Sequence, residues 1–361
     1  SDLHHIGYQQ GYRGINWSAF DASLSPVAEI FSFHGASFSS EGAYPYLHSM
    51  GPVDHHSTAQ YGWAQGHIFG VIGSTDHHNA MPGSYGYGKL AVRADSLTRR
   101  DIWDAIQKRR TYAVTGDRIA LDFAVNSVHM GGIAPASNTR ELAGEVSSHS
   151  AIDAIDILHN NRLIHRETVY PQPQTDADTF NVHVEVGWGE RDAAFQWDVS
   201  LQVVNGALLD VEPRFRGYGP TDAAPDDASY AYNHLDVDRA SKRVNFKTQT
   251  RKNLSLHTPS TEGVSLRVSG DADTCLRVTI NGDTHEVALS DLLQGAKSIY
   301  MGGFVSPVLS LGRAAPHHEC SYSFTFKHEH ESTQRDWYTV RVRQHNNQYA
   351  WSSPVWVDPA N

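Results

Sequence analysis

One carboxylate and two imidazoles, Asp76, His77 and His78, follow a short hydrophobic run at residues 68–72 and three small residues. The run predicts a buried strand. Ligands and metals gather at the carboxyl ends of strands in α/β proteins, because the loops there vary while the sheet stays rigid. Asp76 and His78 are two residues apart and would point to the same side if the strand continued, where an oxygen and a nitrogen could bind one metal ion. The alternative interpretation is a polar turn that only caps a buried strand.

The first 80 residues hold three further pairs of ionisable side chains, namely His4 with His5, Glu29 with His34, and His55 with His56. The first two pairs, like Asp76, lie where a predicted strand meets a loop, and binding residues are often supplied from such positions. No strand is predicted before His55, so we expect the third pair to lie in solvent. The chain contains 22 histidines, which favours metal binding or acid–base chemistry.

Residues 1–118 must supply the elements that position these groups, and hydrophobic runs alternate there with helix-like segments. A strand is predicted at 27–31 and a short helix at 58–66. Thr98 is predicted to cap a second helix, with Asp101 as its acidic partner three residues on, and that helix ends in three basic residues. This alternation predicts an α/β layer or barrel.

From residue 119 the pattern changes to short alternating segments with almost no helical period. Turn signals such as Asn205-Gly206 and Asn281-Gly282 separate the segments. We therefore predict an antiparallel β-sandwich domain over 119–361, with an exposed loop at 213–230. The predicted strands are 119–125, 180–186, 197–203, 264–268, 276–280, 322–326 and 338–342.

Length and composition restrict the class of protein. A chain of 361 residues is long enough for two domains, and 40% hydrophobic and 19% charged residues are typical of a folded protein. No run of about 18 hydrophobic residues occurs, so no membrane span is predicted. A formal net charge of -11 argues against a non-specific nucleic-acid binder, which needs a basic face.

The two cysteines, Cys275 and Cys320, are far apart in the sequence. This spacing excludes a zinc ribbon and a redox dithiol motif. A disulfide between them and a pair of buried free thiols both stay open as interpretations.

Four segments resemble a known family: HHIGY…GINW, EIFSFHG, GSTDHHNAMPGSYG and RRDIWDAIQKRRTYAVTGDRI. They are similar to the later part of PHP-superfamily (polymerase and histidinol phosphatase) metallohydrolases, and in particular to the carbaryl-hydrolase-like branch, which includes many bacterial proteins. The resemblance covers residues 1–131. The β-rich remainder is similar to the trailing sandwich domain of the same proteins, especially at 336–338 and 350–354.

The resemblance implies a distorted seven-stranded (β/α) barrel, of which residues 1–118 would form the C-terminal half. It also implies two or three divalent metal ions at the carboxyl ends of the strands. Zinc, manganese or iron would suit mixed carboxylate and imidazole ligands. By this resemblance, Asp76 and His78 match the last ligand pair. One of His4 and His5, with His5 preferred, matches the histidine of the preceding ligand motif.

Other residues are expected around the metal ions. Glu29 and His34 match a loop of the family that we place in the pocket wall, and His34 or His77 would protonate the leaving group. Tyr85, in a glycine-rich loop, would form a lip of the pocket unless this loop is only a connector. Arg110 would hold an anionic substrate unless it is only a basic residue at a helix C-terminus.

The chain departs from the family in one respect. The family opens with an H-x-H motif on its first strand, followed by further ligands, and no such motif precedes His4. The segment His328-Glu329-His330 matches the H-x-H pattern, but it lies in the predicted sandwich, where the alternation of polar residues along a strand explains it. We therefore expect only the second half of the barrel, completed by a companion N-terminal segment or chain. A periplasmic, secreted or cytoplasmic location is left open.

These observations predict a metal-dependent hydrolase that directs a metal-activated water at an ester, carbamate or amide, or phosphoester bond of a small molecule. The alternative is a non-catalytic module whose sandwich binds a carbohydrate or a protein. Exposed tryptophans would favour this alternative, although tryptophans that alternate in a sandwich lie more often in the core. The candidates are Trp188, Trp197, Trp337, Trp351 and Trp356.

Overall fold

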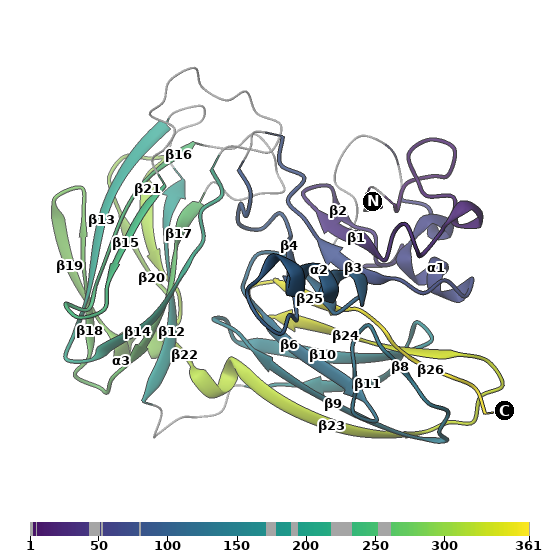
Figure 1. Cartoon of the computed structure of the whole chain (residues 1–361). Coiled ribbons are helices and arrows are strands. Elements are labelled where there is room, and N and C mark those ends of the chain that lie inside the picture. The colour runs from purple at the N-terminus through teal and green to yellow at the C-terminus, as the bar shows by residue number, and fades with distance from the viewer. Residues whose placement is uncertain are drawn as a thin grey trace.

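The protein is mostly β-structure arranged in five sheets (Figure 1). The computed structural model describes residues 3–4, 6–42, 51, 53–78, 81–170, 178–188, 194–217, 233–251 and 261–360. Helices are few and short in this part of the chain, and none of them has both the length and the hydrophobicity to cross a bilayer. They are α1 (Ala59–Ala64), α2 (Arg99–Gln107), α3 (Leu289–Gln294) and the 3-10 turns η1 (Trp17–Ala19), η2 (His55–Ser57) and η4 (His317–Glu319).

The predicted half of a (β/α) barrel is wrong. Strands β1 (Val27–Ser32) and β3 (Gly70–Gly73) pair in parallel, and β2 (Gly35–Ala36) completes a small open sheet with the order β2-β1-β3. The next two strands, β4 (Lys89–Val92) and β5 (Thr111–Val114), belong to another sheet and pair antiparallel, although α2 lies between them. A helical connection can join antiparallel neighbours as well as parallel ones. The strand–helix–strand pattern therefore could not establish a barrel.

Two β-sheets pack face to face to form what we call the first sandwich. One sheet has the order β11-β10-β24-β25-β5-β4, with β26 paired to β24 and β8 paired to β26, and the other has the order β23-β9-β6-β7. Their facing side chains, such as Phe123, Ile155 and Val340, are fully buried in one core. The remaining strands of this sandwich are β6 (Ala120–Val125), β7 (Val128–His129), β8 (Ile133–Ala134), β9 (Thr139–Ser147), β10 (Ile152–His159), β11 (Arg162–Thr168), β23 (Ser321–Glu329), β24 (Asp336–Gln344), β25 (Tyr349–Ser352) and β26 (Val355–Val357).

The chain between β11 and β23 forms the second sandwich. Its sheets have the orders β14-β17-β12-β21-β20, with β22 paired to β12, and β15-β16-β13-β18-β19. Val182, Leu201 and Leu266 are among the buried residues of its separate core. The strands are β12 (Thr179–Trp188), β13 (Ala194–Val204), β14 (Ala207–Pro213), β15 (His234–Asp238), β16 (Arg243–Arg251), β17 (Thr261–Ser269), β18 (Cys275–Ile280), β19 (Asp283–Ala288), β20 (Lys297–Tyr300), β21 (Pro307–Leu311) and β22 (Ala315–Pro316).

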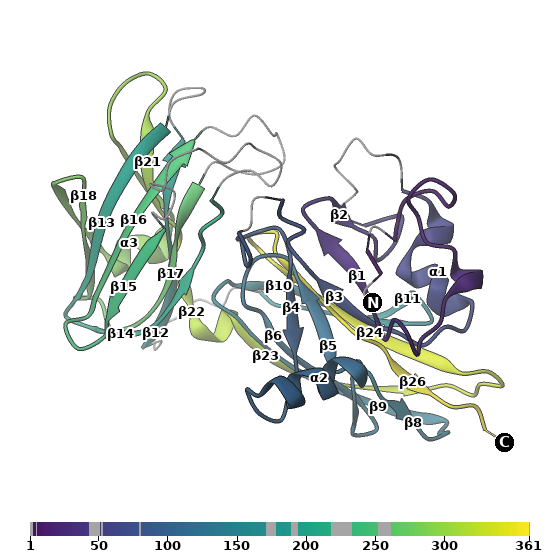
Figure 2. The same cartoon turned by 45° about the horizontal axis from the view of Figure 1, so that its top comes forward.

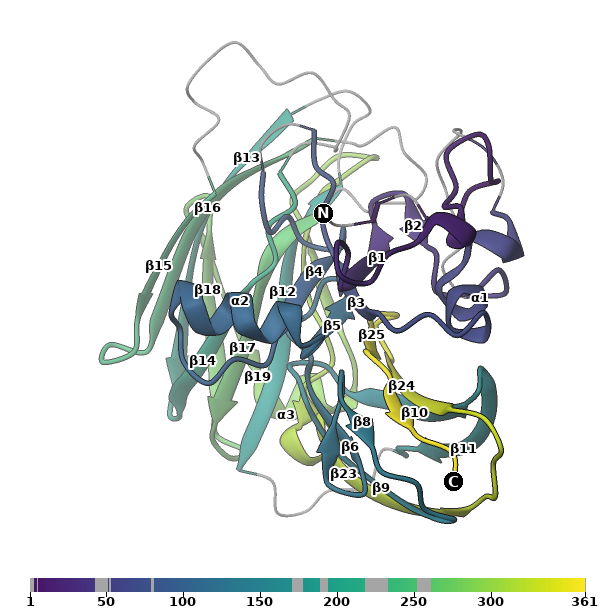
Figure 3. The same cartoon turned by 45° about the vertical axis from the view of Figure 1, so that its right-hand side comes forward.

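The β1–β3 sheet packs on the first sandwich, and the second sandwich stands beside them. Figures 2 and 3 show this arrangement from two further sides. A third core joins Trp63 and Phe69 of the N-terminal part to Trp351 and Trp356 of the first sandwich. The division into residues 1–118 and 119–361 stays a prediction, but β5 already pairs with β25 near the end of the chain.

Several local predictions are confirmed. Thr98 caps α2, since its side chain accepts a hydrogen bond from the backbone N–H of Asp101 at 3.2 Å. The short helix predicted at 58–66 is α1, and the structure adds that Thr58 caps it in the same way. Asn281 and Gly282 connect β18 to β19 with φ angles of 50° and 99°, as a two-residue type I′ hairpin requires. The predicted loop at 213–230 lies mostly outside the described residues.

Side-chain burial answers two questions that the sequence left open. Both cysteines are free thiols, with Cys320 buried and Cys275 partly buried, so no disulfide joins them. Among the tryptophans, Trp197, Trp351 and Trp356 are buried, whereas Trp188 is 45% exposed. Most of the aromatic side chains that would have favoured a binding module therefore serve the cores.

Candidate metal centre

The carboxyl ends of β1 and β3 bring His34 and Asp76 together. The two strands are parallel neighbours, with Glu29 opposite Ile72 and Phe31 opposite Gly73, so their ends lie side by side. The pairing continues beyond β3, because the backbone N–H of Ser74 donates to the carbonyl of Phe31 at 3.0 Å. His34 follows β1 by two residues and Asp76 follows β3 by three. Loops at this sheet edge therefore start from fixed positions.

The Asp76 carboxylate lies at the centre of the cluster. Its Oδ2 is 2.7 Å from His34 Nε2 and 3.6 Å from His4 Nε2, while its Oδ1 is 3.6 Å from His78 Nε2. His34 is fully buried, and the side chain of His78 is 56% exposed. The cluster thus runs from the protein interior to the surface, where a small molecule can approach.

The backbone conformation of Asp76 differs from the expected strand. The strand ends at Gly73, and Asp76 has a φ of 47°, in the left-handed region that aspartate and asparagine tolerate better than most residues. The two-residue alternation between Asp76 and His78 therefore does not apply. Their side chains still meet, because the turn redirects the chain.

Glu29 contacts two residues that border the cluster, Ser74 and His4. It lies on β1, is almost completely buried, and accepts a hydrogen bond from the Ser74 hydroxyl through Oε2. Its Oε1 lies 3.2 Å from His4 Nδ1. This contact is the main cause that raises the pKa of His4, and the nearby Asp76 charge adds to it. With Nδ1 engaged by Glu29, the other ring nitrogen of His4 faces Asp76.

Three of these side chains fit a metal ion. His34, Asp76 and His78 each offer one ligand atom, and the three atoms lie within 4.8 Å of one another. Zinc binds histidine nitrogen and carboxylate oxygen at about 2.0–2.2 Å, so modest side-chain shifts would let the three atoms share one ion. One carboxylate and two imidazoles also match the ligand preferences of zinc, iron and manganese.

The other predicted site residues occupy different positions. His5 lies outside the described residues. The ring of His77 lies 6.0 Å from the ring of Tyr87. Arg110 is paired with Asp95 and Asp104 just beyond the end of α2, at 3.3 and 2.7 Å. These partners correspond to the helix C-terminal cation that the sequence offered as an alternative.

Tyr85 lies in a buried ionic network between the two sandwiches. Its hydroxyl donates to Asp117 at 2.7 Å, and the Arg216 guanidinium lies 4.7 Å from its ring centre. Burial raises the pKa of Tyr85 well above its ordinary value. The side chain is 3% exposed, so it serves this network and forms no pocket lip. By contrast, His55 and His56 are exposed, as expected.

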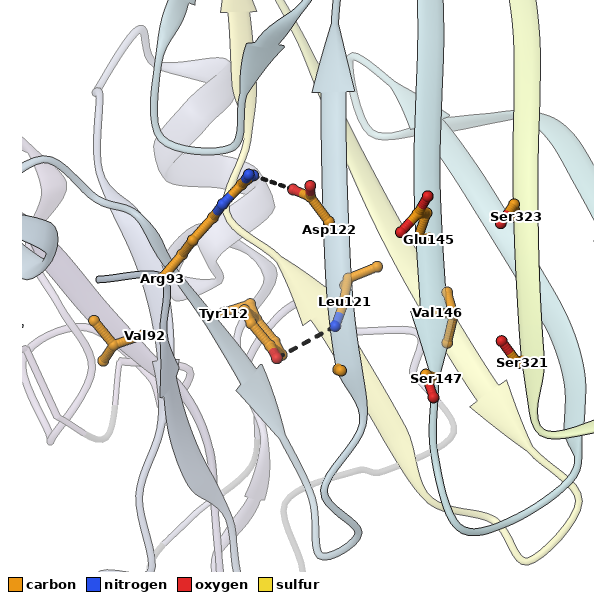
Figure 4. Close-up of a pocket in the computed structure, with 11 residues that line it drawn as sticks. Val92, Arg93, Tyr112, Leu121, Asp122, Glu145, Val146, Ser147, Ser321 and Ser323 are labelled. Carbon is orange, nitrogen blue, oxygen red and sulfur yellow. Dashed lines mark hydrogen bonds and ion pairs between the residues drawn. The ribbon is translucent and has the colours of Figure 1, made fainter. Parts of the chain in front are cut away.

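A separate pocket lies between β4 and β5 on one side and β6, β9 and β23 on the other (Figure 4). None of the predicted site residues lines it. Two pairs form among its polar groups: Arg93 binds Asp122, and the Tyr112 hydroxyl accepts from the backbone N–H of Leu121 at 3.3 Å. The Arg93 and Tyr112 side chains are thus already engaged by the protein itself.

Two features of the candidate metal sites were not predicted from the sequence. Ser74 binds Glu29 beneath the cluster, and a serine after a strand carries no distinctive signal. A second group of three histidines lies elsewhere in the first sandwich, and it includes the motif that had been assigned to strand alternation.

The family and the relatives that this chain matches among known proteins have no assigned activity. A family described as a protein of unknown function (DUF3604) matches residues 84–130. An uncharacterized protein of Chlamydia muridarum is 27% identical over 175 residues, which is 44% of this chain and 28% of that protein. One of Chlamydia pneumoniae is 25% identical over the same shares, and one of Chlamydia trachomatis is 27% identical over 42% of this chain and 27% of that protein. The chain therefore matches less than a third of the length of these relatives.

Proposed function

We propose that this protein is a divalent-metal-dependent hydrolase whose ion is bound by His34, Asp76 and His78. The convergence of these three side chains within 4.8 Å, at the ends of two parallel strands, is the observation that carries the proposal. The resemblance of the motifs to PHP-superfamily metallohydrolases supports the same chemistry. The barrel that this resemblance implied is wrong, but the ligand types do not depend on it.

Each side chain has a distinct task in this proposal. Asp76 supplies one negative charge, and His34 is held in the interior where its orientation is restricted. His78 lies at the exposed edge, where substrate enters. A bound divalent cation supplies a Lewis acid that polarises the bond under attack and lowers the pKa of a coordinated water.

Glu29 and His4 extend the site. Histidines that bind metals usually donate their second ring N–H to a carboxylate, which fixes the tautomer and the ring orientation. Glu29 is placed to accept this bond from His4 Nδ1, and His4 Nε2 lies on the side of Asp76, 3.6 Å from its Oδ2. We therefore propose His4 as a further ligand and Glu29 as the residue that orients it.

The substrate is proposed to be a small molecule with an ester, carbamate, amide or phosphoester bond. The three clustered ligands suffice for one ion. A second or third ion would need ligands beyond them, and we propose that a companion segment or chain supplies these. The formal net charge of -11 gives no general attraction for nucleic acid.

The test uses metal content and hydrolysis together. The chain is loaded separately with zinc, manganese and iron(II), and nitrophenyl acetate, phosphate and carbamate are offered as substrates. Asp76→Asn removes the charge while keeping a residue type that tolerates the left-handed backbone. We expect the variant to lose the ion and at least about 100-fold in turnover.

The matched control is Asp291→Asn, an exposed aspartate in the first turn of α3 in the second sandwich. It should keep both metal and turnover. Equal metal content in Asp76→Asn and the parent protein would contradict the proposed ligand set. Turnover that persists after complete metal removal would contradict the proposed chemistry.

A further inference from the structure

A second group of metal-binding side chains lies at one end of the first sandwich. His159 is the last residue of β10, His328 lies on β23, and His330 follows the end of β23 by one residue. Each offers one ring nitrogen, and the three nitrogens lie within 4.8 Å of one another. The site is separate from the Asp76 cluster, because it shares no residue with it.

The two sheets of the first sandwich build this group together. His159 lies opposite Tyr338 of β24 in one sheet, whereas His328 lies opposite Arg140 of β9 in the other. His328 and His330 are two residues apart, and their rings stack with an angle of 11° between planes. The ring of His159 is inclined to these two rings by 66° and 68°, with centres 5.0 and 4.5 Å away. The imidazoles therefore close the end of the sandwich.

A buried carboxylate supports the three rings. Asp336 Oδ1 lies 3.1 Å from His159 Nε2 and 3.8 Å from His330 Nε2. Its other oxygen, Oδ2, is 2.9 Å from Arg140 Nη1, and both of these side chains are 2% exposed. The Tyr338 hydroxyl lies 3.0 Å from His328 Nδ1 and accepts a hydrogen bond from Arg140 at 3.1 Å. These contacts hold the rings in place before any ligand arrives.

The surroundings of the three rings combine a compensated ion pair with access from solvent. The Arg140 guanidinium compensates the Asp336 carboxylate, so neither of these two buried charges is left without an opposite charge beside the rings. The side chain of His330 is 36% exposed, which gives an ion a route from solvent.

We propose that His159, His328 and His330 form a second metal site that binds Zn²⁺ or a similar borderline divalent ion and ties the two sheets of the first sandwich together. Three neutral imidazoles suit zinc, copper, nickel and cobalt, and the absence of a thiolate among the three disfavours copper(I). The site lies in the β-sandwich, and its role in this proposal is structural. It does not depend on the proposed hydrolase activity.

The experiment uses the full chain carrying Asp76→Asn, so that the other cluster is disabled. Titration with Co²⁺ is followed by visible absorption, and Zn²⁺ is then added as a competitor. We expect one equivalent of Co²⁺ to bind, with the absorption of a nitrogen-ligated ion, and Zn²⁺ to displace it. Adding His330→Asn should weaken binding at least about 100-fold. It should also abolish the rise in melting temperature that Zn²⁺ produces.

The control is His345→Asn, since His345 is an exposed histidine elsewhere in the first sandwich. It should bind Co²⁺ as tightly as its parent. X-ray absorption of the zinc-loaded Asp76→Asn protein adds a readout that needs no second substitution, and we expect three imidazole nitrogens at about 2.0 Å. Unchanged Co²⁺ affinity after His330→Asn, no Co²⁺ binding by Asp76→Asn, or fewer than three imidazole nitrogens would each overturn the proposal.

The two proposals fail in different ways. Equal metal content in the parent and Asp76→Asn proteins would contradict the proposed Asp76 site. Equal Co²⁺ affinity with and without His330→Asn would contradict the proposed histidine site.

Discussion

At the scale of single residues, Asp76 has both a conformational and an electrostatic role. Its left-handed backbone turns the chain after β3, and its carboxylate faces His34, His4 and His78. Asparagine tolerates this backbone nearly as well as aspartate, whereas alanine does not. The conformational and the electrostatic role of Asp76 can therefore be separated by substitution.

We predict that Asp76→Ala is less stable than Asp76→Asn by about 1 kcal/mol, because the left-handed backbone strains alanine but is tolerated by asparagine. Both variants should lose the metal equally. Urea unfolding in the presence of a chelator measures the first difference, and metal analysis measures the second. Equal unfolding free energies of the two variants would show that the turn does not need this residue type.

The sequence predicted part of the site at this scale. Asp76 and His78 stood out because they follow a hydrophobic run, and Glu29 and His34 because they flank the end of another. His159, at the end of β10, could not be linked to His328, because no local pattern indicates that β10 and β23 end at the same place. Contacts between distant segments depend on sheet packing, which single-sequence patterns do not encode.

At the scale of elements, β3 is held against β4 and β5 by close backbone approach. A Cβ atom at Gly73 would lie 2.8 Å from the Lys89 carbonyl oxygen and 3.2 Å from that of Val114. Backbone atoms cannot rotate away as a flexible side chain can. The end of β3, and with it Asp76, therefore depends on a glycine at this position.

Gly73→Ala should destabilise the protein by about 1–3 kcal/mol, since the added methyl group overpacks this contact. It should also weaken metal binding by the Asp76 cluster, because β3 must move. Gly295→Ala is the matched control, as a Cβ there meets nothing within 4 Å. Chemical denaturation and metal titration test both effects, and a Gly73→Ala protein as stable as Gly295→Ala would contradict the close approach.

The sequence predicted strands better than their partners. Alternating segments such as 264–268 and 338–342 lie within β17 and β24. The alternation of strands and helices over 1–118 was taken to indicate a barrel, but β4 and β5 on either side of α2 pair antiparallel, because a helix between two strands does not determine their relative direction. Period and turn signals are local, whereas the direction of pairing depends on the whole sheet.

At the scale of the molecule, buried charges join the two sandwiches. Arg214 lies 2.7 Å from Asp117, and both side chains are buried. His149 lies nearby in the first sandwich, with Ser265 and Asp210 of the second at 3.3 and 3.2 Å. The second sandwich is inserted between β11 and β23, and no composition change in the sequence marked this insertion.

Protonation of His149 should weaken the folded protein in acid. Burial, helped by the Arg267 charge, lowers the pKa of His149 from 6.5 to about 4. The folded state therefore binds this proton more weakly than the unfolded state. The contribution of neutral His149 to the free energy of unfolding is fully present above about pH 6.5 and is lost as the pH falls toward 4.

We predict that the free energy of unfolding of the parent protein falls by about 3 kcal/mol more than that of His149→Asn between these two pH values. Burial raises the pKa of Glu212 to about 7 and that of Glu262 to about 8. Protonation of these two carboxyl groups therefore favours the folded state as the pH falls, opposite to the effect of His149. Both glutamates are present in both proteins, so the comparison isolates His149. Urea titrations at several pH values provide the measurement, and parallel pH profiles would refute the assignment.

The most direct measurement of the central claim is anomalous X-ray scattering at the zinc edge from crystals of the zinc-loaded protein. The account predicts a peak within bonding distance of His34 Nε2, Asp76 and His78 Nε2 at the ends of β1 and β3. A map with no peak between these three side chains, from protein saturated with zinc, would contradict it.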